Sequence, residues 1–305
     1  MPTRRRLLES LGGAALPILT LPILAQPAPA ACSEGAQPAW PRLAMTEGKA
    51  LPASNVTQRM SPEILAELAP TGVLRAGINL GNFLLVTGRS SSGDPEGVSP
   101  GMARAIADRL GVPVRYVPYA RPGELADAVG ANAWDIGLIG AEPQRAEKIA
   151  FTAAYAEIEA TYLVPAGSPI ATLAEVDRAG VRIAVTARSA YDLWLERNIG
   201  HASLVRSDSL DGAFQRFVDE GMEALAGLRP RLLTEAAALP GSRILDGRFT
   251  AVQQAIGTAR GNTAGAAFLR GFVEEAKASG LVARLIERHQ VRGLTVAPAA
   301  DTTMS

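Results

Sequence analysis

The order of apolar and polar positions along the chain predicts short strands that alternate with helices. Strand-length apolar runs lie at residues 73–78, 114–117, 135–139, 161–164, 181–185, 224–226 and 252–257. Helical spacing of apolar residues occurs at 61–68, 99–110, 123–129, 143–148, 189–197, 213–220, 264–279 and 281–289. This alternation predicts an α/β fold with mostly parallel sheets. Ligands of such sheets bind beyond the carboxyl ends of the strands, which makes 79–83, 140–145, 188–191 and 227–229 the candidate binding segments.

The first 30 residues have the pattern of an export signal. Three arginines at 4–6 precede an apolar stretch at 11–24, and an Ala-Pro-Ala sequence at 28–30 has the small residues of a cleavage site. Paired arginines followed by leucines predict a signal of the Tat type. The apolar stretch is shorter than the roughly 20 residues that cross a membrane, although an uncleaved anchor remains the alternative. Residues 31–60 have no apolar period and are predicted to form a linker.

The chain has one cysteine, Cys32, which excludes an internal disulfide framework and a metal site built from a cysteine cluster. Cys32 comes directly after the predicted cleavage region, so a lipoprotein is an alternative, although Pro29 stands where a lipobox has an aliphatic residue. The two histidines, His201 and His289, lie far apart in the sequence, so a histidine-based metal triad is not expected. We therefore expect neither a metal nor another cofactor.

Charge and size narrow the class of protein. The 305 residues include 30 basic and 30 acidic side chains, and removing the three Arg and one Glu of the predicted signal leaves 27 and 29, a net charge of −2. This balance excludes a basic nucleic-acid binder. The chain is 48% hydrophobic and can bury a sizeable core, and its length predicts about two domains. It has neither a Gly-x-Ser-x-Gly motif nor a Gly-rich phosphate loop with its lysine, so an enzyme is not expected.

Five segments, taken in order, are similar to one known family. They are the strand at 73–79; Glu96-Gly97-Val98 with the helix at 102–112; 134–139 with Arg145 and 151–155; the strand at 162–165 with Gly167-Ser168; and the block at 255–262 with the long helix that follows it. Their order and spacing resemble the bacterial extracellular solute-binding proteins of family 3, the polar amino-acid type, which are periplasmic receptors of ABC importers. The resemblance covers roughly residues 72–296.

The resemblance implies the α/β fold called periplasmic binding protein-like type II, in which two α/β lobes are joined by two crossing strands with the ligand cleft between them. Lobe 1 would comprise residues 61–165 and 254–296, lobe 2 residues 166–253, and residues 297–305 a flexible tail. The resemblance also implies a monomeric periplasmic receptor. Such a receptor closes on a small anionic or zwitterionic solute, an amino acid or a related carboxylate, and delivers it to the membrane permease of an ABC importer.

Arg145 is the strongest site residue that the resemblance implies, because the family uses an arginine at this position to bind the ligand's carboxylate. A planar guanidinium suits that task, since it donates two parallel charge-assisted hydrogen bonds. Gly140 and Ala141 lie in the loop before it, directly after a predicted strand. In lobe 2, Arg188 and Ser189 begin a helix. Their backbone N–H groups and the Ser189 hydroxyl either hold the same carboxylate or only cap the helix.

The other candidates depart from the family pattern. The family's acidic partner for a ligand's α-ammonium is expected at position 228, which is leucine here and argues against an ordinary amino-acid ligand. Glu142 either supplies that acid from lobe 1, or caps the helix that follows and pairs with the arginine three residues on. Arg229 is either a second cation for a dianionic ligand or a solvated surface residue. Phe83 and Tyr191 are candidates for the aromatic side of the cleft, with a place in the core as the alternative for Phe83.

Two other functions stay open beside that of an importer receptor. A few periplasmic dehydratases resemble these receptors and use cleft carboxylates as acids and bases. Glu142 or Glu157 would serve here if burial raised its pKa. Receptor domains of this type also occur in signalling proteins, so a stand-alone ligand-sensing partner protein is the second alternative.

Overall fold

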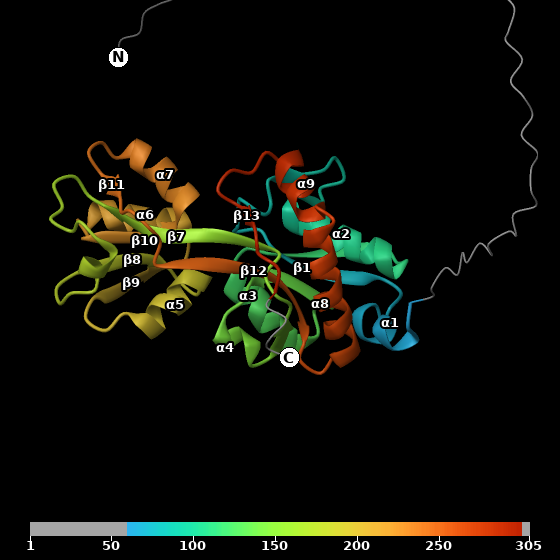
Figure 1. The fold of residues 1–305 in the computed structure, drawn as a ribbon. Helices are drawn as coiled ribbons and strands as arrows, with labels where there is room; N and C mark the ends of the chain where they lie inside the picture. The colour runs from blue at the N-terminus through green and yellow to red at the C-terminus, as the bar shows by residue number, and fades with distance from the viewer. Residues whose placement is uncertain (1–59, 301–305) are drawn as a thin grey trace, which may run out of the picture. The chain divides into compact units, whose positions relative to one another are not determined.

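The structure is a computed structural model that describes residues 60–300. In this part of the chain two α/β lobes are joined by two long strands, β7 (Ala156–Val164) and β12 (Thr250–Ala259) (Figure 1). The two strands pair antiparallel and run from one lobe into the other. They connect the strands of both lobes into one sheet, with the order β4-β1-β5-β12-β7-β10-β8-β9. The predicted architecture of two lobes and two crossing strands is confirmed. The predicted signal peptide and Cys32 lie outside the described residues.

Lobe 1 is built on a parallel group of strands. β1 (Leu74–Asn79) pairs parallel with both β4 (Val114–Tyr119) and β5 (Ile136–Gly140). Its helices are α1 (Pro62–Leu68), α2 (Val98–Leu110), α3 (Pro122–Asp127), α4 (Pro143–Ala146), α8 (Thr263–Ala278) and α9 (Leu281–Arg288). Every residue of β5 is buried, and α2 buries Met102 and Ile106, as the predicted apolar spacing of that helix requires.

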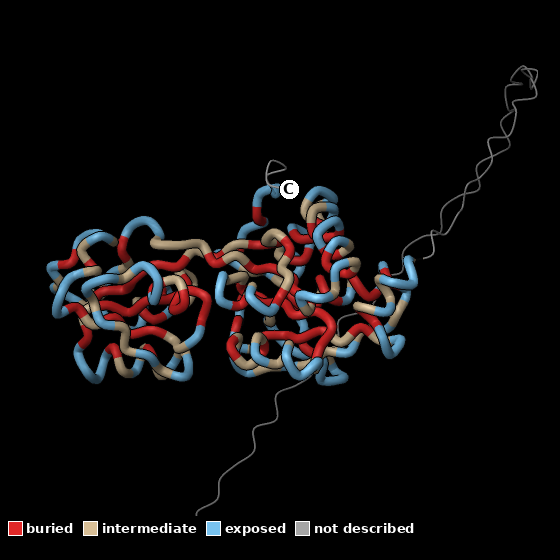
Figure 2. Tube along the Cα trace, turned by 90° about the horizontal axis from the view of Figure 1, so that it is seen from below, coloured by how far each residue is buried: buried red, intermediate tan, exposed pale blue. Residues whose placement is uncertain are grey.

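Lobe 2 repeats this arrangement with β8 at the centre. β8 (Arg182–Thr186) pairs parallel with β9 (Ser203–Ser207) and β10 (Ala224–Leu228), and the helices are α5 (Ala190–Asn198), α6 (Leu210–Asp219) and α7 (Arg229–Ala238). Ser189 and Ser209 are N-cap residues whose side chains accept the N–H groups of Asp192 and Gly212, at 3.1 and 3.0 Å. Figure 2 shows buried residues inside each lobe and exposed residues on the outside.

The apolar pattern of the sequence did not predict two elements of lobe 2 or several short elements. β9 has only exposed and half-buried residues, and α7 buries only Leu232 and Glu235, so neither produces a clear apolar run. β7 extends five residues before its predicted start, because Glu157 and Glu159 interrupt the apolar sequence there. The remaining short elements are β2 (Gly88–Arg89), β3 (Pro95–Glu96), η1 (Ala128–Ala131), β6 (Ile149–Phe151), η2 (Leu173–Val176), β11 (Arg243–Ile244) and β13 (Thr295–Val296).

The described end of the chain packs against lobe 1. Ala297 is buried, the Lys277 ammonium donates to the Pro298 carbonyl at 2.7 Å, and the Ala300 N–H donates to Glu274 at 3.2 Å. The segment predicted as a tail therefore begins with residues that are held on α8. The predicted lobe boundaries at 165/166 and 253/254 stay a prediction. Among residues 60–300, no helix combines the length and apolar character needed to cross a membrane.

Candidate ligand-binding site

A cavity of about 470 Å³ lies between the lobes, beyond the carboxyl ends of the strands. From lobe 1 it is lined by Asn79 at the end of β1, by Asn82 and Phe83 in the next loop, by Gly140 at the end of β5, and by Arg145 on α4. A volume of this size suits a small organic molecule. Its position agrees with the expectation that strand ends form the binding site.

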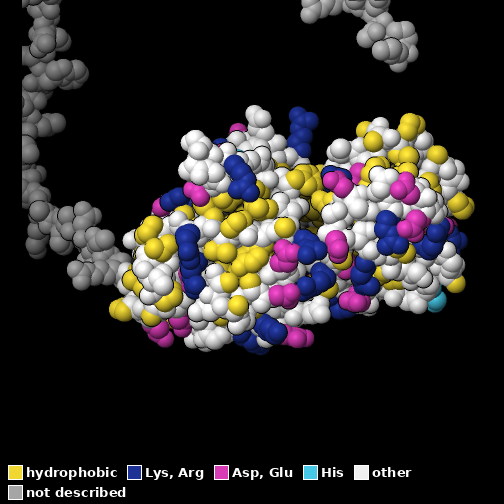
Figure 3. Space-filling model, turned by 180° about the vertical axis from the view of Figure 1, so that it is seen from behind, with side chains coloured by type: hydrophobic (Ala, Val, Ile, Leu, Met, Phe, Trp, Pro, Cys, Tyr) yellow, Lys and Arg dark blue, Asp and Glu magenta, His cyan; other side chains and the backbone are white. Residues whose placement is uncertain are grey.

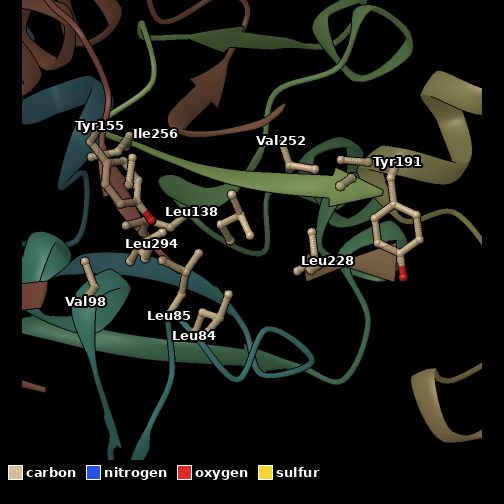
Figure 4. Packing of buried hydrophobic residues seen from close by; sticks show 14 of the residues in the cluster. Leu84, Leu85, Val98, Leu138, Tyr155, Tyr191, Leu228, Val252, Ile256 and Leu294 are labelled. Carbon is tan, nitrogen blue, oxygen red and sulfur yellow. The ribbon is translucent and has the colours of Figure 1, made fainter. Parts of the chain in front are cut away.

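The lobe 2 side of the cavity combines the start of α5 with apolar residues. Ser189 and Tyr191 belong to the first turn of α5, Leu228 is the last residue of β10, and Val252 comes from the crossing strand β12. Figure 4 shows Leu228, Val252 and Tyr191 at the lobe 2 end of the buried cluster. Leu228 is 7% exposed and Val252 5%. The part of the wall formed by Leu228 and Val252 is therefore apolar and almost fully buried.

Arg145 is a buried cation that forms no ion pair with the described residues. It is 6% exposed, and it donates to the carbonyls of Gly140 at 2.7 Å and Arg188 at 2.8 Å. Burial lowers the pKa of Arg145 to about 10, so its guanidinium still carries a positive charge at neutral pH. A guanidinium has five N–H groups, and those two bonds leave three of them for other acceptors. The site can therefore accept a small anion.

Arg188 connects the lobes behind Arg145 and does not line the large cavity. Its φ is +56°, and the Arg188 carbonyl accepts the bond from Arg145 across the lobe boundary. Its own guanidinium donates to both carboxylate oxygens of Asp127 on α3, at 2.8 and 2.9 Å. This bond is the main cause that lowers the pKa of Asp127. Arg188 thus lines a smaller neighbouring cavity of about 190 Å³ together with Asp127, a place different from the one that the sequence suggested.

Three other predicted residues also lie outside the large cavity. Glu142 is at the N-cap position of α4, but its carboxylate accepts a bond from Arg197 at 2.5 Å and neither caps the helix nor pairs with Arg145. Ala141 is tied by its N–H to the Gln253 carbonyl at 2.8 Å. The Arg229 guanidinium bonds to Glu159 at 2.7 Å and to the Gly247 carbonyl, away from the cleft.

The lobe 2 arginine in the cavity is Arg231, which the sequence reasoning missed. It lies in the first turn of α7, where its guanidinium bonds to Glu235 at 2.7 Å and to Asp211 at 2.5 Å. Glu235 is buried behind it, and this burial raises the pKa of the Glu235 carboxyl. Pro230 at the start of a helix was the available signal, because proline is favoured in the first turn.

The predicted aromatic residues divide between the cleft and the core. Phe83 is 39% exposed and lines the cavity from lobe 1. Tyr191 also lines it, but its side chain is buried in the wall, and its hydroxyl forms no hydrogen bond with the described residues. Trp194, one turn further along α5, packs on Phe249 with ring centroids 5.3 Å apart.

Charge on the accessible surface is mixed. Figure 3 shows basic and acidic side chains side by side on the face that it displays. Within residues 60–300 no group of three His, Cys, Asp or Glu side chains is placed to hold a metal ion. The displayed face therefore has no large region of one charge, and the buried cation Arg145 is a local feature of the cavity.

The fold and the interlobe cavity define a two-lobed α/β binding protein. A family model for bacterial extracellular solute-binding proteins, family 3, matches residues 82–291. The chain belongs to this family, so the family predicted from the five sequence segments is confirmed. A search of curated proteins finds no match.

Solved structures with the same fold include proteins of different roles. A mutant of ArgBP from T. maritima is 21% identical with a TM-score of 0.61, and the match covers 75% of this chain and all of that one. The ancestral amino-acid-binding protein AncCDT-1, a precursor of cyclohexadienyl dehydratase, is 21% identical with a TM-score of 0.60, covering 73% and 98%. A histidine kinase sensor domain is 18% identical with a TM-score of 0.62, covering 74% and 98%. At these identities the similarity establishes the fold.

Proposed function

We propose that this protein is the substrate-binding receptor of an ABC importer and that it binds a small carboxylate-bearing solute between its lobes. The observation that carries the proposal is Arg145, a buried cation that has no acidic partner among the described residues and lines the interlobe cavity. A carboxylate would neutralise this charge and accept its remaining N–H groups. No reaction is required of such a site, and membership of an extracellular solute-binding family supports the proposed delivery to a membrane permease.

The start of α5 supports the same anion site. The Ser189 hydroxyl accepts the Asp192 N–H as an N-cap and donates to no group within residues 60–300, so its proton can be donated to a ligand oxygen. The N-terminal end of α5 also carries partial positive charge. The backbone N–H groups of Arg188 and Ser189 are already bound, to the Asp192 carboxylate at 2.7 Å and the Thr186 carbonyl at 3.3 Å, so the expectation that they hold the ligand is not met. Because Arg145 bonds to the carbonyl of Arg188, directly before this helix, the lobe 1 cation and the lobe 2 helix start are neighbours. One carboxylate between them would contact both lobes.

Lobe closure is the proposed mode of binding. β7 and β12 are the connections about which the lobes would move, and three ion pairs join the lobes when they are together. These pairs are Arg188 with Asp127 at 2.8 Å, Arg197 with Glu142 at 2.5 Å and Arg121 with Asp208 at 3.6 Å. Gly140 allows the close approach, since a Cβ there would lie 3.0 Å from the Cβ of Ala190 in lobe 2. These contacts between the lobes stabilise the closed state, and a ligand that binds this state best therefore binds with higher affinity when they are present.

Asp127→Asn is expected to weaken ligand binding about two- to five-fold at low salt. The substitution removes an exposed cross-lobe ion pair, and such pairs contribute about 0.2–1 kcal/mol. The difference should shrink as added salt screens the pair. Calorimetric titration at two salt concentrations measures it. The control is Asp108→Asn, an exposed acid on α2, and a loss of affinity as large in that variant would refute a specific role for the Arg188–Asp127 pair.

The enzyme alternative has less support from the cavity. The carboxylates considered for acid–base chemistry were Glu142 and Glu157, and neither lines it. Glu235 has a raised pKa, but its carboxylate is bound to Arg231 and is not a lining group. A ligand-sensing partner protein would need the same binding site. Binding to a membrane permease would distinguish the importer receptor from such a sensor.

Export to the periplasm by a Tat-type signal is part of the proposal. It is supported by the arginines at 4–6 and by the extracellular role of the family. Lipid attachment at Cys32 remains the alternative to a freely diffusing receptor. Both features belong to the part of the chain outside residues 60–300.

A thermal-shift screen of the purified protein tests the proposed function. Amino acids, monocarboxylates, dicarboxylates and polyamines are compared, because a ligand that binds the native state raises the melting temperature with concentration. A carboxylate is expected to give the largest shift. A response confined to polyamines would contradict the proposal, and turnover of any hit would favour the enzyme alternative.

A further inference from the structure

The cavity has one charge that no described side chain balances. Arg121, Arg145 and Arg231 are its lining cations, and two of them have acidic partners among the lining residues. Arg231 bonds to Asp211 at 2.5 Å, and Arg121 lies 3.6 Å from Asp208. Arg145 makes its two hydrogen bonds to backbone carbonyls. The described lining groups therefore leave one positive charge, and it is buried.

The carboxylates that line the cavity lie on its solvent side. Within residues 60–300 these are Asp208 and Asp211, whose side chains are 89% and 88% exposed. The buried wall contributed by Leu228 and Val252 offers no oxygen from its side chains. A positively charged group bound in the interior of the cavity would thus have no carboxylate from the described residues beside it.

This arrangement treats the two charges of an amino acid differently. A ligand carboxylate at Arg145 gains charge-assisted hydrogen bonds and neutralises a buried cation. An ammonium group held against Leu228 would lose its hydration without gaining a counter-charge, and it would add a second positive charge to the same cavity. The same molecule without its ammonium group keeps the interaction of its carboxylate with Arg145. It avoids the free-energy cost of burying an ammonium group without a counter-charge.

We propose that the cleft selects carboxylates with an apolar body and no α-ammonium group, such as 2-oxo acids and unsubstituted carboxylic acids, over the corresponding amino acids. The inference rests on the proposed function, since it specifies the ligand of the same site. Leu228 is the specificity-determining residue. The ligand's apolar body would lie between Phe83 of lobe 1 and the wall formed by Leu228 and Val252.

Matched ligand pairs test the inference in the unchanged protein. Calorimetric titration compares leucine with 4-methyl-2-oxopentanoate, and phenylalanine with 3-phenylpropanoate. Each second compound is expected to bind at least tenfold more tightly than its amino acid. Equal or tighter binding of the amino acids would overturn the inference and leave the carboxylate receptor intact. If no carboxylate bound at all, the proposed function would fail together with the inference.

Leu228→Asp gives a second, directional test. The new carboxylate would face the cavity and supply the missing counter-charge, so the preference within each pair should shift toward the amino acid by at least tenfold. Leu233→Asp is the control, because Leu233 lies on α7 with 58% exposure and is not among the lining residues. An unchanged preference in a folded Leu228→Asp protein would contradict the role of Leu228. If that variant does not fold, the comparison in the unchanged protein still decides the inference.

Discussion

Arg145→Met is expected to weaken carboxylate binding by about 100-fold or more. The substitution removes a buried positive charge and two charge-assisted hydrogen bonds to the ligand, each contributing about 1.5–3 kcal/mol. Calorimetric titration with the tightest carboxylate from the thermal-shift screen measures the change. Arg145→Lys should be intermediate, since an ammonium keeps the charge but cannot donate in the fixed parallel geometry of a guanidinium.

Folding has to be separated from binding in these variants. Arg145 also donates to the Gly140 and Arg188 carbonyls, so its loss leaves two buried acceptors while it relieves an unpaired buried charge. In the ligand-free protein the unsatisfied carbonyls lower the free energy of unfolding, and the removal of the buried charge raises it. The melting temperature without ligand measures their sum. A folded Arg145→Met protein that binds carboxylates with unchanged affinity would disprove the proposed site.

Gly97→Ala is expected to destabilise lobe 1 by about 3 kcal/mol or more. Gly97 precedes α2 with φ of +146°, and a Cβ there would lie 2.3 Å from the Leu85 carbonyl oxygen and 2.9 Å from the Val86 Cα. Both neighbours are backbone atoms that cannot rotate away, and a residue with a Cβ rarely adopts this conformation. The melting temperature should fall by roughly 6 °C or more for a protein of this size.

Gly88→Ala is the matched control in the adjacent short hairpin. Gly88 is an exposed residue of β2, and a Cβ added there would meet no other atom within 4 Å. Its replacement should change the melting temperature by no more than about 2 °C. Similar melting temperatures for Gly97→Ala and the unchanged protein would show that the loop from Asn82 to Gly97 can rearrange at little cost.

The succession of strands and helices was predictable, because most elements bury a regular apolar face. β5 is the clearest case, since all five of its residues are buried and its sequence is a continuous apolar run with two glycines. β9 and α7 were missed for the opposite reason. Their buried contacts are few, so the apolar signal is weak even though the main-chain hydrogen bonds are regular.

The site was only partly predictable. Arg145, Ser189, Gly140, Phe83 and Tyr191 line the cavity, whereas the candidates Arg188, Glu142, Ala141 and Arg229 do not. The exchange of Arg229 for Arg231 has a simple geometric reason. Two residues apart on a helix, side chains point in directions about 200° apart, so the residue that faces the cleft depends on where α7 begins.

The sequence by itself determined the α/β alternation, the family, and the unusual leucine at position 228. These are properties of local spacing and of residue identity, which do not depend on how distant segments meet. Only the tertiary structure decided which charges remain unpaired. Arg145 and Glu142 are three residues apart in sequence, yet Glu142 bonds to Arg197 and Arg145 to the Arg188 carbonyl. The groups of lobe 2 that lie next to Arg145 and Glu142 determine whether each charge is paired within the protein.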